Sequence, residues 1–155
     1  YSAFVDAGGG ALRDLSHELD YTLWLLSGWR CVTAVGGHVS KLEIETDDVF
    51  SVLLRTGLCN NVFVHMNYVD PVGRRTVLVI TAEKTIELDL LRGTIAINDN
   101  KEDCPADRDL TYREMHKAIL RDDWSDVCSY AEGAEVMRLI ESAEQASSKG
   151  VWVKR

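Results

Sequence analysis

The side chains best suited to proton transfer are concentrated in one predicted helix near the start of the chain, directly after three glycines at 8–10. With about 100° per residue, Asp14 and His17 fall on one side of this helix and a row of leucines falls on the other. An imidazole, whose unperturbed pKa is about 6.5, exchanges a proton near neutral pH. A neighbouring carboxylate can fix its tautomer and stabilise the imidazolium. The same arc also carries Asp20, Tyr21 and Trp24.

Two interpretations of this helix face remain open on residue chemistry alone. It is either a site for a bound molecule or an ordinary exposed face of mixed acidic and aromatic character. A metal site built from His17 with Asp14 or Asp20 is a further alternative, because two carboxylates and one imidazole can ligate a metal.

The elements around this helix have the alternating pattern of a β meander. Alternation predicts strands at 31–35, 49–55, 62–68, 76–80, 86–90 and 94–97, with one last edge strand at 151–153. Short connections favour antiparallel pairing. The polar stretch 98–109 is predicted to be a loop, and helices are predicted at about 109–121 and 130–148. The expected fold class is therefore α+β, with one predominantly antiparallel open sheet and helices packed on one face.

The second face of the predicted sheet is mixed rather than fully polar. Alternation places five residues there: Ser51, Arg55, Phe63, His65 and Asn67. We expect this face to pair with a second copy of the chain, giving a homo-oligomer.

Composition limits the classes of partner. The 155 residues suit a single domain over 1–155, and the net charge of −8 argues against nucleic acid or an anionic membrane. No apolar run approaches the ~20 residues needed to span a bilayer. The four cysteines do not have zinc-site spacing, so reduced thiols and a cytoplasmic location are expected. They are Cys31, Cys59, Cys104 and Cys128.

The order of motifs resembles the C-terminal domain of the Gfo/Idh/MocA family of NAD(P)-dependent oxidoreductases. The segments that carry the resemblance are Gly8–Tyr21, Glu45–Asp48, Asn67-Tyr68 with Arg74-Arg75, Thr85–Asp89 and Ser147–Gly150. The resemblance implies an α+β domain that supplies the substrate pocket and an oligomerising sheet. It also implies an upstream Rossmann domain, so that this chain is expected to be a fragment of a two-domain enzyme.

The resemblance further implies roles for particular residues. His17 and Asp14 are expected to be catalytic, beside the substrate carbon that gives up hydride. The expected substrate-binding residues are Asp20, Tyr21, Tyr68, Arg74 and Arg75. The implied reaction moves hydride between NAD or NADP and a hydroxyl carbon of a sugar, nucleotide sugar or polyol. Many family members space the Asp and the His four residues apart, whereas Asp14 and His17 are three apart.

The cofactor itself is expected to be bound mainly by the other domain. The glycines at 8–10 precede the predicted strands, whereas a dinucleotide-binding GxGxxG follows a first strand. No cofactor-binding residue is therefore assigned in this chain, and the fragment alone is expected to be inactive. The alternative is a stand-alone, non-catalytic module that binds a ligand and dimerises. Arg74 and Arg75 could likewise bind a substrate phosphate or carboxylate, or be solvated turn residues.

Overall fold

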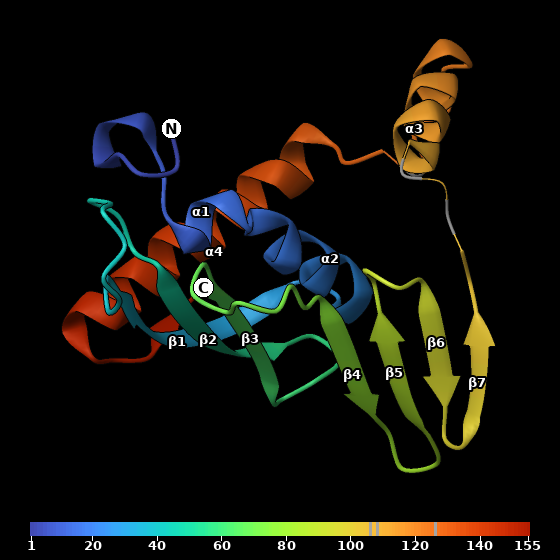
Figure 1. Ribbon diagram of the computed structural model, residues 1–155, viewed down its shortest axis with the longest axis horizontal. Helices are drawn as coiled ribbons and strands as arrows, with labels where there is room; N and C mark the ends of the chain where they lie inside the picture. The colour runs from blue at the N-terminus through green and yellow to red at the C-terminus, as the bar shows by residue number, and fades with distance from the viewer. Residues whose placement is uncertain (106, 108, 126) are drawn as a thin grey trace. The chain divides into compact units, whose positions relative to one another are not determined.

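The computed structural model describes residues 1–105, 107, 109–125 and 127–155 (Figure 1). The chain forms two compact units, the first made of 1–69 with 128–155 and the second of 70–127. Both units contain an antiparallel four-stranded open sheet together with helical segments, which confirms the predicted α+β class.

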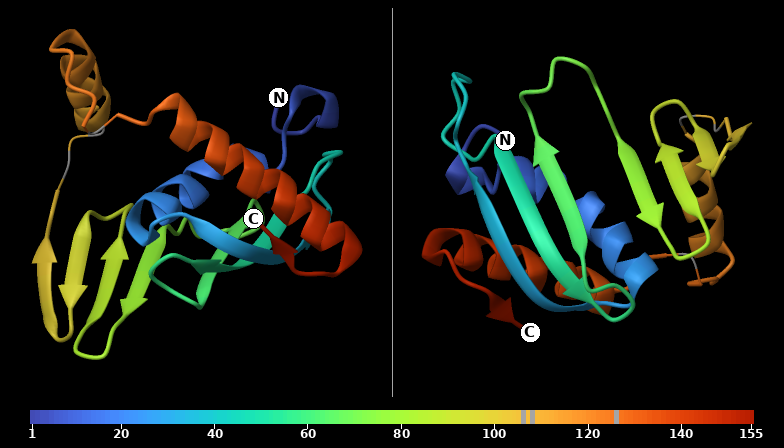
Figure 2. Two further views of the ribbon diagram at one scale, coloured as in Figure 1. Left: turned by 180° about the vertical axis from the view of Figure 1, so that it is seen from behind. Right: turned by 90° about the horizontal axis from the view of Figure 1, so that it is seen from below.

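The first unit is an open sheet in the order β3-β2-β1-β8, with every pair antiparallel. Its strands are β1 (Trp29–Gly37), β2 (Val49–Thr56), β3 (Val62–Asn67) and β8 (Val153–Lys154). Its helices are α1 (Ala11–Asp14), α2 (Ser16–Leu26) and α4 (Tyr130–Lys149), and a short 3-10 helix at Val5–Ala7 precedes α1. Helix α4 packs against β1, and α2 packs beside α4 (Figure 2). A last edge strand is present, but β8 covers Val153–Lys154 rather than the predicted 151–153, and it pairs with β1.

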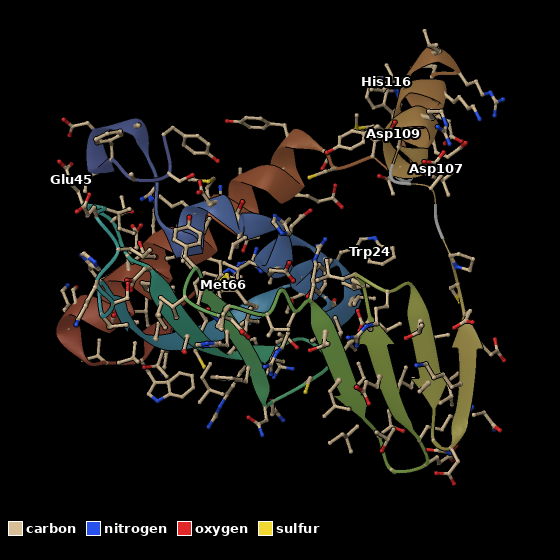
Figure 3. All side chains as sticks on the ribbon, in the orientation of Figure 1. Trp24, Glu45, Met66, Asp107, Asp109 and His116 are labelled. Carbon is tan, nitrogen blue, oxygen red and sulfur yellow. The ribbon has the colours of Figure 1, made fainter. Side chains whose placement is uncertain are left out.

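Alternation along the strands separates a core face from an open face. On β2, Phe50, Val52 and Leu54 are buried, and they meet the helix face through Leu19 and Leu139. Met66 of β3 is 2% exposed and lies under the helices (Figure 3). The hydrophobic pattern alone therefore predicts which side of this sheet the helices cover.

The second unit contains a second sheet in the order β4-β5-β6-β7 and one helix. Its elements are β4 (Thr76–Ile80), β5 (Thr85–Asp89), β6 (Thr94–Ile97), β7 (Asn100–Asp103) and α3 (Leu110–Leu120). Strand β7 lies in the stretch predicted to be a loop, of which residues 106 and 108 lie outside the described part. Asn98 has φ +52°, as a tight hairpin between β6 and β7 requires, while the side chains of β7 are all exposed and polar. A strand without apolar residues gives no alternating signal.

Two further features differ from the expected organisation. In the described part of the chain, the strands form two sheets rather than one: β3 is an edge strand of the first sheet and β4 is an edge strand of the second, and side-chain turns at Asn67 and Asp70 lie in the connection between them. Asn67 Oδ1 accepts from the Val69 N–H at 3.0 Å, and Asp70 Oδ1 accepts from the Val72 N–H at 2.9 Å. The predicted first helix is divided into α1 and α2 at Leu15, whose φ of −95° and ψ of 24° leave the helical region.

Candidate functional site

The glycine run brings the start of α1 against the chain's own backbone. The space that a Cβ would need at Gly9 is taken by the Ser2 carbonyl, and at Gly10, which has φ +114°, by the Asp47 carboxylate. Asp47 Oδ2 accepts from the Leu12 N–H at 2.9 Å and its carbonyl oxygen accepts from the Ala11 N–H at 2.9 Å. Asp47 therefore caps α1 and fixes the position of Asp14 at its end.

This arrangement does not fit a dinucleotide. A glycine-rich loop that binds pyrophosphate offers free backbone N–H groups and a positive helix end. Here the N–H groups of Ala11 and Leu12 already donate to Asp47, and a carboxylate occupies the place where phosphate would bind. The glycines make room for the residues of this chain rather than for a cofactor.

Asp14 forms a partly buried pair with Tyr68, which follows β3. The Tyr68 hydroxyl donates to Asp14 Oδ2 at 2.6 Å. Burial raises the pKa of the Asp14 carboxyl, but the hydroxyl groups of Ser2, Tyr68 and Tyr1 outweigh it and hold that pKa below its usual value. Burial and the neighbouring carboxylate raise the pKa of the Tyr68 phenol. At neutral pH the pair therefore consists of an ionised acceptor and a protonated donor.

His17 lies in a second cluster, on the first turn of α2. Its Nε2 is 3.0 Å from Oε1 of Glu18, and the Tyr21 hydroxyl donates to the other oxygen of Glu18 at 2.5 Å. The imidazole is 49% exposed, whereas the Glu18 side chain is 14% exposed. His17 is thus accessible from solvent and is held by a largely buried carboxylate.

The structure pairs the predicted residues differently from the expectation. Asp14 was a candidate either to orient His17 or to bind a second substrate hydroxyl, and in the described part of the chain it makes no hydrogen bond to that imidazole. The chain leaves helical geometry at Leu15, between the two residues, and each finds its own partner. Sequence reasoning missed Glu18, although its spacing to Tyr21 (i, i+3) is the one at which helix side chains meet.

The remaining predicted residues are more dispersed. Asp20 is half-buried. Burial of the Cys128 thiol, near the start of α4, and next the negative charge of Asp20 raise the pKa of that thiol. Arg74 and Arg75 belong to the second unit. Arg74 is largely exposed and its Nε lies 3.2 Å from Asp70 Oδ2, as expected of a solvated turn residue. The carbonyl oxygen of Arg75 accepts from the Leu90 N–H at 2.8 Å.

The described part of the chain, residues 1–105, 107, 109–125 and 127–155, also bears on metal binding and on membrane insertion. In that part of the chain, no three His, Cys, Asp or Glu side chains are grouped so as to hold a metal ion. None of its helices combines the length and the apolar character needed to cross a membrane.

Comparison with known proteins identifies a family. A model described as the GFO/IDH/MocA C-terminal domain matches residues 2–87, a range that includes Asp14, His17 and Tyr68. A comparison with curated proteins found no match.

Similar solved structures are oxidoreductases. GenD2 from gentamicin A biosynthesis, in complex with NAD, is 23% identical with a TM-score of 0.76 over 96% of this chain and 48% of its own. The aldose-aldose oxidoreductase from Caulobacter crescentus, complexed with glycerol, is 19% identical with a TM-score of 0.75 over the same shares. The WlbA dehydrogenase from Bordetella pertussis, in complex with NADH and UDP-GlcNAcA, is 16% identical with a TM-score of 0.74 over 95% and 48%. At these identities the likeness is one of fold, and the chain spans about half the length of each.

Proposed function

This chain belongs to the GFO/IDH/MocA C-terminal domain family, and on that premise we propose that it is the substrate-binding and oligomerisation domain of an NAD(P)-dependent oxidoreductase. The substrate class is a sugar, nucleotide sugar or polyol. Two similar structures support this class: an aldose-aldose oxidoreductase complexed with glycerol, and the WlbA dehydrogenase in complex with NADH and UDP-GlcNAcA. Because the glycine run of this chain is closed to phosphate, we assign the cofactor to a Rossmann domain outside it.

In this proposal the residues of the chain bind the substrate and move its proton. The nicotinamide, bound elsewhere in the whole protein, supplies the acceptor for the hydride of the alcohol carbon. His17 takes the hydroxyl proton, because its imidazole is half exposed and held by Glu18. Asp14 stays ionised beside Tyr68 and accepts a hydrogen bond from a second substrate hydroxyl. The alcohol carbon thereby becomes a carbonyl carbon.

The observation that carries this proposal is the family match over the segment that holds Asp14, His17 and Tyr68. The test is the turnover of a full-length enzyme that contains this chain. His17→Ala is expected to lower kcat by about 10²–10⁴-fold, the usual contribution of a positioned acid or base. Thermal stability should change little, because the imidazole is half exposed. His116→Ala, on the exposed surface of α3, is the control, and equal turnover of the two variants would refute the assignment.

The open face of the first sheet supports the oligomerisation part of the proposal. In the antiparallel register of β2 with β3, Leu53 lies opposite Phe63 and Ser51 lies opposite His65 on this face. The Phe63 side chain is 66% exposed. The Phe63 and His65 rings stack 6.3 Å apart, which forms a flat surface suited to a second copy. Phe63→Glu is expected to convert an oligomer to a monomer in sedimentation velocity, whereas Val39→Glu, at an exposed loop position, should not. A wild-type protein that is already monomeric at micromolar concentration would contradict this part.

A further inference from the structure

An imidazole lies on the open face of the first sheet, in a row of side chains that crosses three strands. The register places Val35 of β1 opposite Ser51 of β2, and Ser51 opposite His65 of β3. The Ser51 hydroxyl and His65 Nδ1 form a hydrogen bond of 2.8 Å, and the Phe63 ring stacks on the imidazole. Val35 is 71% exposed and Phe63 is 66% exposed. His65 is therefore held beside exposed apolar side chains on the face that we assign to a second copy.

The four strands of this sheet contain no Asp or Glu, although acidic residues outnumber basic ones by 25 to 17 in the whole chain. The turn 57–61 between β2 and β3 contains none either. A second copy that pairs through the same face presents the same set of side chains. Neither copy therefore offers a carboxylate from these strands to a protonated His65.

The other charged groups of the sheet are all basic. Apart from His65, the charged and titratable side chains of the four strands are Arg30, Cys31, Arg55 and Lys154. Arg55 Cζ lies 5.7 Å from the centre of the Trp152 ring, and Arg30 Nη2 donates to the Gly57 carbonyl oxygen at 2.6 Å. A positive charge on His65 would thus be added to a face that already carries only positive charge.

Protonation changes the cost of covering this face more than it changes the position of the imidazole. The Ser51 hydroxyl can donate to a neutral ring and accept from a charged one, so it holds the ring in both states. It does not neutralise the charge. Burying an unpaired charge against apolar side chains is strongly unfavourable, whereas a neutral, hydrogen-bonded imidazole can be buried.

We propose that the open face admits a second copy only while His65 is neutral, so that two copies associate at neutral pH and separate in mild acid. This proposal rests on the oligomerisation proposed above and adds its regulation. An imidazole with the ordinary pKa of about 6.5 gains its charge as the pH falls through that value. The association is therefore expected above this pH and is lost below it.

The test is sedimentation velocity of the full-length protein over a range of concentrations at pH 8 and at pH 5.5. At pH 5.5 an imidazole of ordinary pKa is about ten parts charged to one part neutral. Because a dimer contains two His65 side chains, exclusion of the charged ring should raise its Kd about 100-fold between the two pH values. Far-UV circular dichroism at both pH values checks that the fold is retained.

Three variants separate His65 from other effects of acid. His65→Asn keeps a polar group for Ser51 but takes up no proton, so its dimer should persist at pH 5.5. His65→Lys carries its charge at pH 8 and should dissociate there, which tests the same point without acid. His116→Asn, on the exposed surface of α3, should behave as the wild type.

The sign of the effect distinguishes the proposal from general electrostatics. The chain has a net charge of −8, so acid reduces the repulsion between copies and by itself favours association. A wild-type dimer with the same or a lower Kd at pH 5.5 would overturn the proposal and leave the oligomerisation intact. Equal weakening of the wild type and His65→Asn would do the same. A monomer at both pH values would overturn the proposal together with the oligomerisation on which it rests.

Discussion

Replacing Tyr68 by phenylalanine removes the hydroxyl that donates to Asp14 Oδ2 at 2.6 Å and leaves the ring in place. A hydrogen bond to a charged group contributes about 1.5–3 kcal/mol, and we take the lower end because Asp14 is only partly buried. Tyr68→Phe should therefore lower the free energy of unfolding at pH 7 by about 1.5 kcal/mol. Urea denaturation followed by far-UV circular dichroism measures this difference.

The pH dependence of this loss follows from the direction of the Asp14 pKa. That pKa is held below its usual value in the folded state, so the stabilisation is fully present above the unfolded pKa of about 3.9. It is lost as the pH falls through the folded value. Since a hydrogen bond to an ionised group is roughly twice as strong as a neutral one, the effect of Tyr68→Phe should shrink to about half in acid.

A matched control is available in the same unit. Tyr130 of α4 is 93% exposed, and Tyr130→Phe should leave the free energy of unfolding unchanged at both pH values. The reasoning is refuted if Tyr68→Phe is no less stable than Tyr130→Phe at pH 7. It is equally refuted if the loss is the same at neutral and acid pH, because the charge of Asp14 would then make no contribution.

Two further substitutions test the caps of α1 and α4. Gly10→Ala should lower the free energy of unfolding by more than about 1 kcal/mol, because φ is +114° and the Asp47 carboxylate fills the space of the new methyl group. Gly133→Ala, in α4, is the control: the added methyl group meets open space and should raise the free energy of unfolding by about 0.4–1 kcal/mol in the same urea titration. Equal effects of the two would contradict the close packing of the glycine run. Ser129→Ala removes the capping box with Glu132 and should cost about 1 kcal/mol, with faster amide hydrogen exchange in the first turn of α4. Ser148→Ala, at the far end of the same helix, should leave that exchange unchanged, and a rate unaffected by Ser129→Ala would show that the cap does not hold the helix end.

The main strands and α4 could be predicted because their core positions recur with a clear period. Phe50, Val52 and Leu54 alternate along β2, and Val136, Ile140 and Ala143 repeat along α4 at helical spacing. The split into two sheets could not be predicted this way, because alternation indicates where strands lie but not which strands pair with one another.

The candidate site was predictable in its residues but not in its pairing. The spacing of Asp14 and His17 indicates a shared helix face only if the helix is continuous. Leu15 leaves the helical region, so the angular argument fails between these two residues. Within α2 the helix is regular, and there the i, i+3 relation of Glu18 and Tyr21 holds. A prediction limited to unbroken turns would have included Glu18.

The first unit is built from two segments that are far apart in the sequence, since α4 and β8 follow the whole of residues 70–127. During synthesis on a ribosome, β1 to β3 emerge well before the helix that supplies Leu139, Ile140 and Ala143 to their core. The second sheet is built from consecutive hairpins and can form as soon as it has emerged, since contacts between nearby residues form fast. The apolar face of β1 to β3 therefore stays uncovered by α4 for the time needed to translate about eighty residues, at about 5–20 residues per second. For that interval of several seconds, the apolar face and the unpaired strand edges of β1 to β3 make the nascent chain prone to aggregation.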